Sequence, residues 1–289
     1  MATLIMNDAT SIVHDALEGF VMMHPELALL DALEQDIKVV LRKDWDPACG
    51  KVALISGGGS GHEPSHAGWV GRGMLTAAVC GDVFASPSVD AVTAAIHAVA
   101  GPGQSPDAAS AATAPAPAGS APGHPGVCLI IKNYGGDRLN FGLAAERARA
   151  AGIPTRTVVV ADDCALKGAG ATGRRGVAGT VLVHKVAGAV AEAGGSLEEV
   201  AAAAERAAAA VATLGVATST CSVPGRPHDP RLDAVGTFEV GLGIHGEPGK
   251  AQVTGMTARD VAATCVDGIR QRKAEDSPAW AAAAAEHGL

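Results

Sequence analysis

Short apolar runs alternate with stretches of helical periodicity in the first two thirds of the chain. The runs Lys51–Ser56, Val127–Lys132 and Thr155–Val160 are rich in valine, isoleucine and leucine, as buried strands are, and Phe141–Ala151 has the spacing of a helix. Strands and helices in alternation predict an α/β fold, with a parallel-rich sheet flanked by helices. Ligands of such sheets bind at the carboxyl ends of the strands.

The pattern after residue 176 is first helical and then mixed. Val177–Gly194 and Ser196–Leu214 predict helices, and Ser196 followed three residues later by a glutamate has the spacing of a capping box. Phe238–Ile244 is typical of a strand, and Thr257–Leu289 of one helix with an alanine-rich, frayed end. These elements predict a second, smaller and incomplete α/β part.

Composition suggests where these parts begin and end. Residues 101–126 consist almost wholly of glycine, proline, serine, alanine and threonine, so they have little to bury and predict a disordered insertion. We expect one α/β domain over residues 1–194, which contains this insertion, and a partial second subdomain over residues 195–289.

Charge and composition exclude several classes of protein. The net charge of −8 and an aromatic content of 3% do not suit a nucleic-acid binder, which needs basic faces and stacking platforms. No stretch has the roughly 18 to 20 strongly apolar residues of a membrane span. The first 37 residues lack lysine and arginine, unlike targeting signals, and the six cysteines show no metal or redox spacing. We therefore expect a reduced, cytoplasmic protein that binds neither nucleic acid nor membrane.

A glycine-rich segment follows the first predicted strand. Gly57–Gly61 is typical of a tight turn that brings backbone N–H groups close to a small ligand, and it lacks the Lys-Ser/Thr ending of a P-loop. His62 and His66 fit the His-Glu-x-x-His zinc pattern, but Pro64 interrupts the helix that a zinc site needs. We expect a loop at the start of a helix, with His62 as the useful histidine, His66 in packing or hydrogen bonding, and no metal. A metal hydrolase remains an alternative.

Polar residues also follow the second predicted strand. Lys132 and Asp137 lie five residues apart across a Gly-Gly bend, where they could hold a hydroxyl group and remove its proton. Asp137 also suits the cap of a helix that begins at Arg138. The two roles are compatible, because a capping carboxylate keeps one oxygen free.

Two later segments carry further candidate residues. His245 lies among the glycines of 241–249, where an open imidazole could act as a base or nucleophile, or only form a hydrogen bond in a turn. The adjacent carboxylates Asp162 and Asp163 predict a solvated loop in which Arg174 and Arg175 pair with them, and we do not assign them to the active site.

With these segments, the chain resembles the dihydroxyacetone kinase family, and specifically the domain or subunit that binds dihydroxyacetone. Apart from the insertion, the resemblance runs from about residue 7 to residue 249. The motifs that carry it are Asn7-Asp8, His24-Pro25, Gly57–Pro64, His66–Gly68, Gly81–Ser88, Lys132–Phe141, Gly173–Gly176, Val223–Gly225 and Gly241–Gly249.

The resemblance implies roles for individual residues. His245 would add through a ring nitrogen to the ketone carbon of dihydroxyacetone and form a covalent hemiaminal. His62 and Asp137 would be the acid/base pair, with Asp137 activating the terminal hydroxyl that receives the phosphoryl group to give glycerone phosphate. The substrate-binding residues implied are Gly59, Ser60, Gly61, His62, Lys132 and Asp137.

The resemblance also implies which molecules the chain meets. Covalent capture would admit dihydroxyacetone and short aldoses such as glyceraldehyde, and reject glycerol, which has no carbonyl. The chain itself shows no phosphate cradle, and in the family a separate helical domain or subunit holds Mg-ATP or Mg-ADP. We therefore expect no cofactor on this chain, an ATP-binding partner and a homodimer. ATP or a phosphocarrier protein as phosphate donor, and an FMN cyclase side activity, stay open.

The chain departs from the family pattern in the insertion and after residue 249. Family members continue there with a further apolar strand and a segment that contains Asn-Gly-Gly. The first hypothesis is thus a transferase, the substrate-binding component of a glycerone kinase in glycerol metabolism. The alternative is a truncated, non-catalytic paralogue that binds short ketoses or a kinase subunit.

Overall fold

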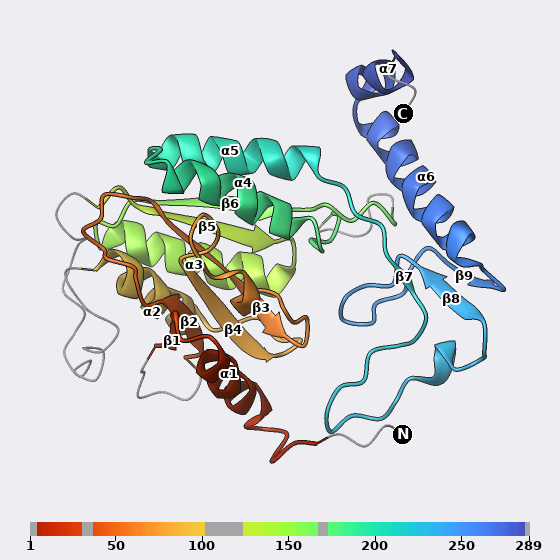
Figure 1. The fold of residues 1–289 in the computed structure, drawn as a ribbon, viewed down its shortest axis with the longest axis horizontal. Helices are drawn as coiled ribbons and strands as arrows, with labels where there is room; N and C mark the ends of the chain where they lie inside the picture. The colour runs from red at the N-terminus through yellow and green to blue at the C-terminus, as the bar shows by residue number, and fades with distance from the viewer. Residues whose placement is uncertain (1–4, 31–36, 102–123, 167–172, 287–289) are drawn as a thin grey trace.

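The computed structural model describes residues 5–30, 37–101, 124–166 and 173–286, which form a six-stranded and a three-stranded sheet (Figure 1). The strand order in the larger sheet is β1-β2-β4-β3-β5-β6. Pairing is parallel from β4 through β3 and β5 to β6, and antiparallel where β2 meets β1 and β4. The prediction of a parallel-rich α/β sheet is confirmed. All but the ends of the predicted insertion at 101–126 lies outside the described residues.

The strands of the larger sheet carry its buried apolar residues. They are β1 (Leu27–Leu29), β2 (Val39–Arg42), β3 (Ala53–Ser60), β4 (Ala77–Val83), β5 (Val127–Lys132) and β6 (Thr155–Val160). Two of them, β5 and β6, have the bounds that the sequence predicts. The expectation of a tight turn at Gly57–Gly61 is wrong, because Gly57 to Ser60 continue β3 and pair with β4. The strand approaches its neighbours so closely that a Cβ atom on Gly57 would lie 3.1 Å from the carbonyl carbon of Val79.

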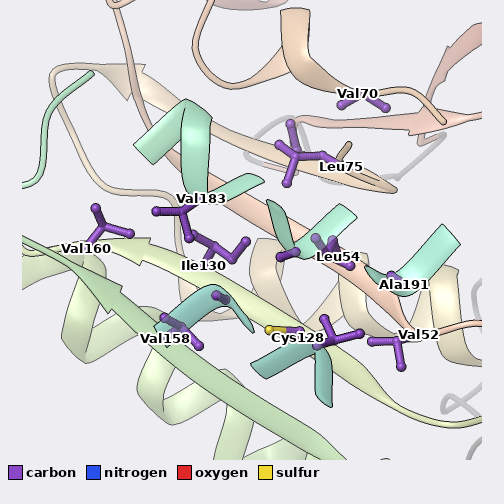
Figure 2. Close-up of a cluster of buried hydrophobic side chains, with 14 of the residues drawn as sticks. Val52, Leu54, Val70, Leu75, Cys128, Ile130, Val158, Val160, Val183 and Ala191 are labelled. Carbon is purple, nitrogen blue, oxygen red and sulfur yellow. The ribbon is translucent and has the colours of Figure 1, made fainter. Parts of the chain in front are cut away.

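Helices cover both faces of the larger sheet (Figure 1). They are α1 (Ile12–Met23), α2 (Val89–Ala100), α3 (Gly135–Ala150), α4 (Thr180–Glu192) and α5 (Leu197–Ala210), with a 3-10 turn, η1, at Ala67–Trp69. Alternate strand residues divide between two cores. Leu54 and Ile130 pack with Val183 of α4 in the core drawn in Figure 2, while Ile55 and Leu129 pack with α2 and α3 on the opposite face.

The helix ends differ from expectation at one functional position. Ser196 caps α5 in a capping box with Glu199, as predicted. The helix expected from Arg138 begins instead at Gly135, so Asp137 lies inside its first turn and is not the N-cap residue, which is Tyr134.

The second part of the chain is a small antiparallel sheet with helices beside it. Its elements are β7 (Val216–Ala217), η3 (Pro230–Leu232), β8 (Thr237–Val240), β9 (Ala251–Thr254), α6 (Ala258–Asp276) and α7 (Pro278–Glu286). The strand expected to run to Ile244 ends at Val240, because Gly241 turns the backbone with φ of +76°. The tail expected to fray is helical as far as Glu286. The domain division at residue 194 stays a prediction, and α5, which follows it, packs against β6.

Among the described residues, no helix combines the length and apolar character that crossing a membrane requires.

Candidate active site

The carboxyl ends of β3 and β5 and the loop after β8 meet around a cavity of about 240 Å³. Five predicted residues line it, namely Gly59, His62, Lys132, Asp137 and His245. The remaining lining residues are Phe84, Ser86, Tyr134, Gly135 and Gly136. Drug-sized ligands occupy pockets of about 300–1,000 Å³, so this cavity suits a smaller molecule. Two further predicted residues, Ser60 and Gly61, line an adjacent cavity instead.

His245 is oriented by a neighbouring carboxylate. Its Nδ1 lies 2.8 Å from Oε1 of Glu247, and its backbone N–H donates to Oε2 of the same residue at 2.9 Å. Burial alone would raise the pKa of Glu247, but hydrogen bonds from the His245 ring and from backbone N–H groups outweigh it and lower the pKa to about 2. An ionised carboxylate can accept hydrogen bonds but not donate them, so the ring proton of His245 is on Nδ1. The Nε2 atom of His245 then keeps a lone pair that is available for attack on a ligand.

His62 lies against His245 in the cavity. The two rings are 4.9 Å apart in a T-shaped contact, and Phe84 stacks on His62 at 4.9 Å and also contacts His245 at 5.3 Å. Burial, with the nearby positive charge of Lys132, lowers the pKa of His62 to about 3, so the ring is neutral near pH 7. Its Nε2 atom has no hydrogen-bond partner among the described residues. That nitrogen is therefore available to a ligand oxygen.

Asp137 and Lys132 form the charged part of the cavity lining. Both side chains are buried, and Ser86 Oγ donates to Asp137 Oδ1 at 2.5 Å. Burial raises the pKa of Asp137, opposed by the Ser86 hydrogen bond and by Lys132, and burial also lowers the pKa of Lys132. A buried carboxylate with a raised pKa is suited to accept a proton from a ligand hydroxyl.

Sequence reasoning did not assign roles to three residues around the cavity. Ser86 holds Asp137, Tyr134 packs on the His245 ring with centroids 4.8 Å apart, and Glu247 orients that ring. The sequence feature that could have indicated a role for Ser86 is its position in the motif Gly81–Ser88. A Cβ atom on Gly136 would lie 2.6 Å from Ser86 Oγ, so the Gly-Gly bend after β5 lets the serine approach.

The carboxylates that follow β6 are structural, and the expected solvated loop is wrong. Asp162 is fully buried and accepts hydrogen bonds from the backbone N–H groups of Val177 and Gly179, both at 2.7 Å. Asp163 pairs with Arg175 at 2.5 Å, so the expected arginine pairing holds there. Backbone N–H groups before α4 are buried and need acceptors, a requirement that the sequence does not display.

The zinc-like pattern does not form a helical site. After His62 the chain makes turns and then η1, not the α-helix that we expected to start there. His66 points to Ser56 and to the ring of His184, while His62 faces His245. The part of the chain that the structure describes contains no cluster of three or more histidine, cysteine or acidic side chains that could hold a metal ion.

Comparisons with known proteins agree on one family. A family model described as the Dak1 domain matches residues 18–285. The dihydroxyacetone-binding subunit DhaK of a PTS-dependent dihydroxyacetone kinase from Listeria innocua is 47% identical over 246 residues, which are 85% of this chain and 67% of that protein. Triokinase/FMN cyclase of Bos taurus is 48% identical over 263 residues, which are 91% of this chain and 41% of that protein.

A solved structure has the same fold. The crystal structure of the dihydroxyacetone kinase of C. freundii superposes with a TM-score of 0.79 and 42% identity, over 94% of this chain and 46% of that one. The chain thus spans less than half the length of several relatives that it matches, with 38% and 41% of the first two curated ones.

Proposed function

The chain belongs to the Dak1 family, and from this premise we propose that it is the dihydroxyacetone-binding component of a glycerone kinase. The observation that carries the proposal is the small cavity in which a carboxylate-oriented His245 faces His62 and Asp137. A cavity of about 240 Å³ suits a triose, and its polar side chains come from β5, from α3 and from the loops after β3 and β8, so several groups can bind the oxygens of a polyhydroxy carbonyl compound.

Substrate capture starts at His245. The Nε2 lone pair forms a bond to the ketone carbon, and the carbonyl π electrons move to the oxygen, which takes up a proton that the neutral His62 ring relays from solvent. The His245 ring, which is cationic once it is bonded to carbon, loses its Nδ1 proton through Glu247 to solvent, so that one proton enters the site and one leaves it. Because glycerol has no carbonyl carbon to attack, the site distinguishes it from dihydroxyacetone although both carry hydroxyl groups.

Phosphoryl transfer then takes place at the terminal hydroxyl. Asp137 accepts the hydroxyl proton as that oxygen attacks the phosphorus atom of the donor, and the bond between phosphorus and the donor's leaving group breaks, so that this group (ADP where ATP is the donor) departs with the bonding electrons. Lys132 binds a substrate oxygen and offsets negative charge. We expect Mg-ATP or Mg-ADP to be held on a separate ATP-binding domain or subunit, with ATP or a phosphocarrier protein as the phosphate donor. Binding of glyceraldehyde, the homodimer and the cytoplasmic location stay predictions.

Native mass spectrometry tests the capture step. The chain incubated with dihydroxyacetone should gain the mass of one triose, and glycerol should give no adduct. His245→Ala should abolish the adduct. His228→Ala is a matched control, because His228 is an exposed histidine paired with Asp233 in the same part of the chain. This variant should still form the adduct. A wild-type chain without an adduct would refute the proposal.

Turnover separates the kinase component from the non-catalytic alternative. With ATP and the ATP-binding domain of a family member, the wild-type chain should form glycerone phosphate, and without that domain it should form none. An adduct without turnover in the presence of the partner domain would identify a ketose-binding paralogue instead.

A further inference from the structure

Three polar groups from different elements converge over the backbone of Gly58. A Cβ atom on this residue of β3 would lie 3.6 Å from Oδ2 of Asp137, 3.6 Å from Cε of Lys132 and 3.8 Å from Nε2 of His66. Because Gly58 has no side chain, the space between these groups is bounded by a hydrogen-bond acceptor of Asp137, the end of the Lys132 side chain and a ring nitrogen. Asp137 and Lys132 line the active-site cavity, whereas His66 is buried and is not among the residues that line it.

The hydrogen bonds of Ser56 fix the tautomer of His66. Ser56 Oγ donates its one hydrogen to the carbonyl oxygen of Ile130 at 2.6 Å, so it can only accept from His66 Nδ1, which lies 3.4 Å away. The proton of the neutral ring is then on Nδ1, and Nε2 is an acceptor. This Nε2 atom is buried and has no hydrogen-bond partner among the described residues. Buried acceptors are nearly always paired with protein or ordered water.

We propose that an ordered water molecule binds over Gly58 and joins His66 to Asp137 and Lys132. The water donates one hydrogen to His66 Nε2 and the other to Asp137 Oδ2, and it accepts from Lys132 Nζ. Three partners are what a buried water typically has. Ser86 already holds Oδ1 of Asp137, so the water fixes the second carboxylate oxygen, and His66 is a positioning residue that acts through the water.

The water has a consequence for the charge state of Asp137. A hydrogen bond to the ionised carboxylate favours that form, so removal of the water raises the pKa of Asp137. The groups that face Asp137 are Lys132 from β5, His245 from the loop after β8, Tyr134 before α3 and His66 from the segment between β3 and η1, together with the Ser86 hydroxyl. Burial opposes the ionised form, whereas the Ser86 hydrogen bond and Lys132 favour it, as the water does.

Gly58→Ala removes the water without a steric clash. The added methyl group would meet all three neighbours at ordinary contact distances of 3.6 to 3.8 Å, so we expect the fold to persist while the methyl occupies the solvent site. Gly142→Ala is the matched control, because a Cβ atom there has nothing within 4 Å. His66→Asn provides a second variant, which keeps a donor for Ser56 but has no counterpart of Nε2, and His66→Gln restores a polar atom near that position.

The site itself is tested without substrate. A crystal structure of the wild-type chain should show a water within about 3.2 Å of His66 Nε2, Asp137 Oδ2 and Lys132 Nζ, and Gly58→Ala should lack it. Nitrogen-15 NMR of the histidine rings should find His66 neutral and protonated on Nδ1. Absence of that water, or a proton on Nε2, would overturn the proposal. These readouts do not depend on dihydroxyacetone.

The positioning role rests on the proposed function and is tested by pH profiles with the ATP-binding partner domain present. In Gly58→Ala and His66→Asn, the acid limb of glycerone phosphate formation should move to higher pH and the maximal rate should fall about tenfold. Gly142→Ala should match the wild type, and His66→Gln should recover part of the shift. Rates that fall equally at all pH values would refute the positioning role. A wild-type chain without an adduct would instead refute the proposed function.

Discussion

At the scale of single residues, the buried carboxylate of Asp137 is the proton acceptor of the proposed phosphoryl transfer. Asp137→Asn keeps the size of the side chain but cannot accept the hydroxyl proton. The adduct at His245 should therefore persist, while formation of glycerone phosphate falls about 10²-fold or more. Mass spectrometry and a coupled phosphate-transfer assay measure the two steps separately. Asp90→Asn, at an exposed position paired with Arg147, is the control, and an unchanged rate in Asp137→Asn would remove Asp137 from the mechanism.

A second residue-scale prediction concerns His184, which is fully buried on α4 and contacts the ring of His66 at 5.3 Å. Burial lowers its pKa from the model-peptide value of 6.5 to about 3. Between these values the unfolded chain binds a proton that the folded chain does not, so stability is lost as pH falls from 6.5 towards 3. The free energy of unfolding should fall by up to about 1.4 kcal/mol per pH unit for this one proton.

Urea unfolding at a series of pH values measures this dependence. His184→Leu, an apolar residue of similar size, should make the decline in unfolding free energy less steep by close to one proton. His14→Leu, at an exposed position on α1, should leave the decline as it is in the wild type. The same slope in wild type and His184→Leu would contradict the assignment.

Single residues also show what a sequence can and cannot reveal about a site. The sequence predicts the position of Lys132 because it ends an apolar run typical of a strand, and that of Asp137 because a Gly-Gly bend follows this strand, and both residues line the cavity. Ser86 and Glu247 were not assigned roles, because their importance comes from contacts with Asp137 and His245 that only the folded chain creates. The expectation that Asp162 lies in a solvated loop is wrong, because the residues next to it in the sequence do not indicate that its side chain is buried.

At the scale of elements, the glycine-rich end of β3 is the clearest difference between expectation and structure. Glycine runs usually predict turns, because glycine adopts conformations that other residues avoid. Here Gly57 and Gly59 serve close packing: Cβ atoms on them would lie 3.1 Å from the carbonyl carbon of Val79 and 2.7 Å from the backbone nitrogen of Ala85, respectively. Glycine does favour turns in general, but here the close contacts with neighbouring backbone hold Gly57 and Gly59 in an extended strand.

Capping boxes begin both α5 and α6, and their different burial leads to an element-scale prediction. Ser196 caps α5, which buries Leu197 and Val200, whereas Thr257 caps α6, in which no residue is buried. Ser196→Ala should lower the global free energy of unfolding by about 1 kcal/mol. Thr257→Ala should reduce helical circular dichroism by fraying α6 while it leaves the main urea transition nearly unchanged. Equal shifts of that transition would show that α6 is as firmly integrated as α5.

At the scale of the whole molecule, the candidate site joins two parts that differ in how much of their side-chain surface is buried. The larger sheet has two extensive cores, whereas β9 is fully exposed and α6 buries no residue. Polar contacts connect the parts, among them Arg175 to the carbonyl oxygen of Gly241 at 2.8 Å and Arg174 to Asp276 at 2.5 Å. His245 follows β8 in the less buried part, while Lys132 and Asp137 belong to the larger sheet.

This asymmetry predicts how substrate changes the motions of the chain. Segments with few buried contacts open more often, and a ligand that binds only the closed form raises their protection from hydrogen exchange. Without substrate, backbone amides of β8 and β9 should exchange faster than those of β3 and β5. A triose that is bonded to His245 and also held by Asp137 and Lys132 bridges the two parts, so saturating dihydroxyacetone should slow exchange in β8 and β9 and leave β3 and β5 nearly unchanged.

Hydrogen-exchange mass spectrometry with two controls distinguishes covalent bridging from simple occupancy. Glycerol, which has similar hydroxyl groups but no carbonyl, should give no protection at the same concentration, and neither should dihydroxyacetone with His245→Ala. Asp137→Asn should retain most of the protection, because the covalent bond between His245 and the triose remains in this variant. Protection by glycerol, or protection that survives His245→Ala, would mean that the hydroxyl contacts alone hold the two parts together.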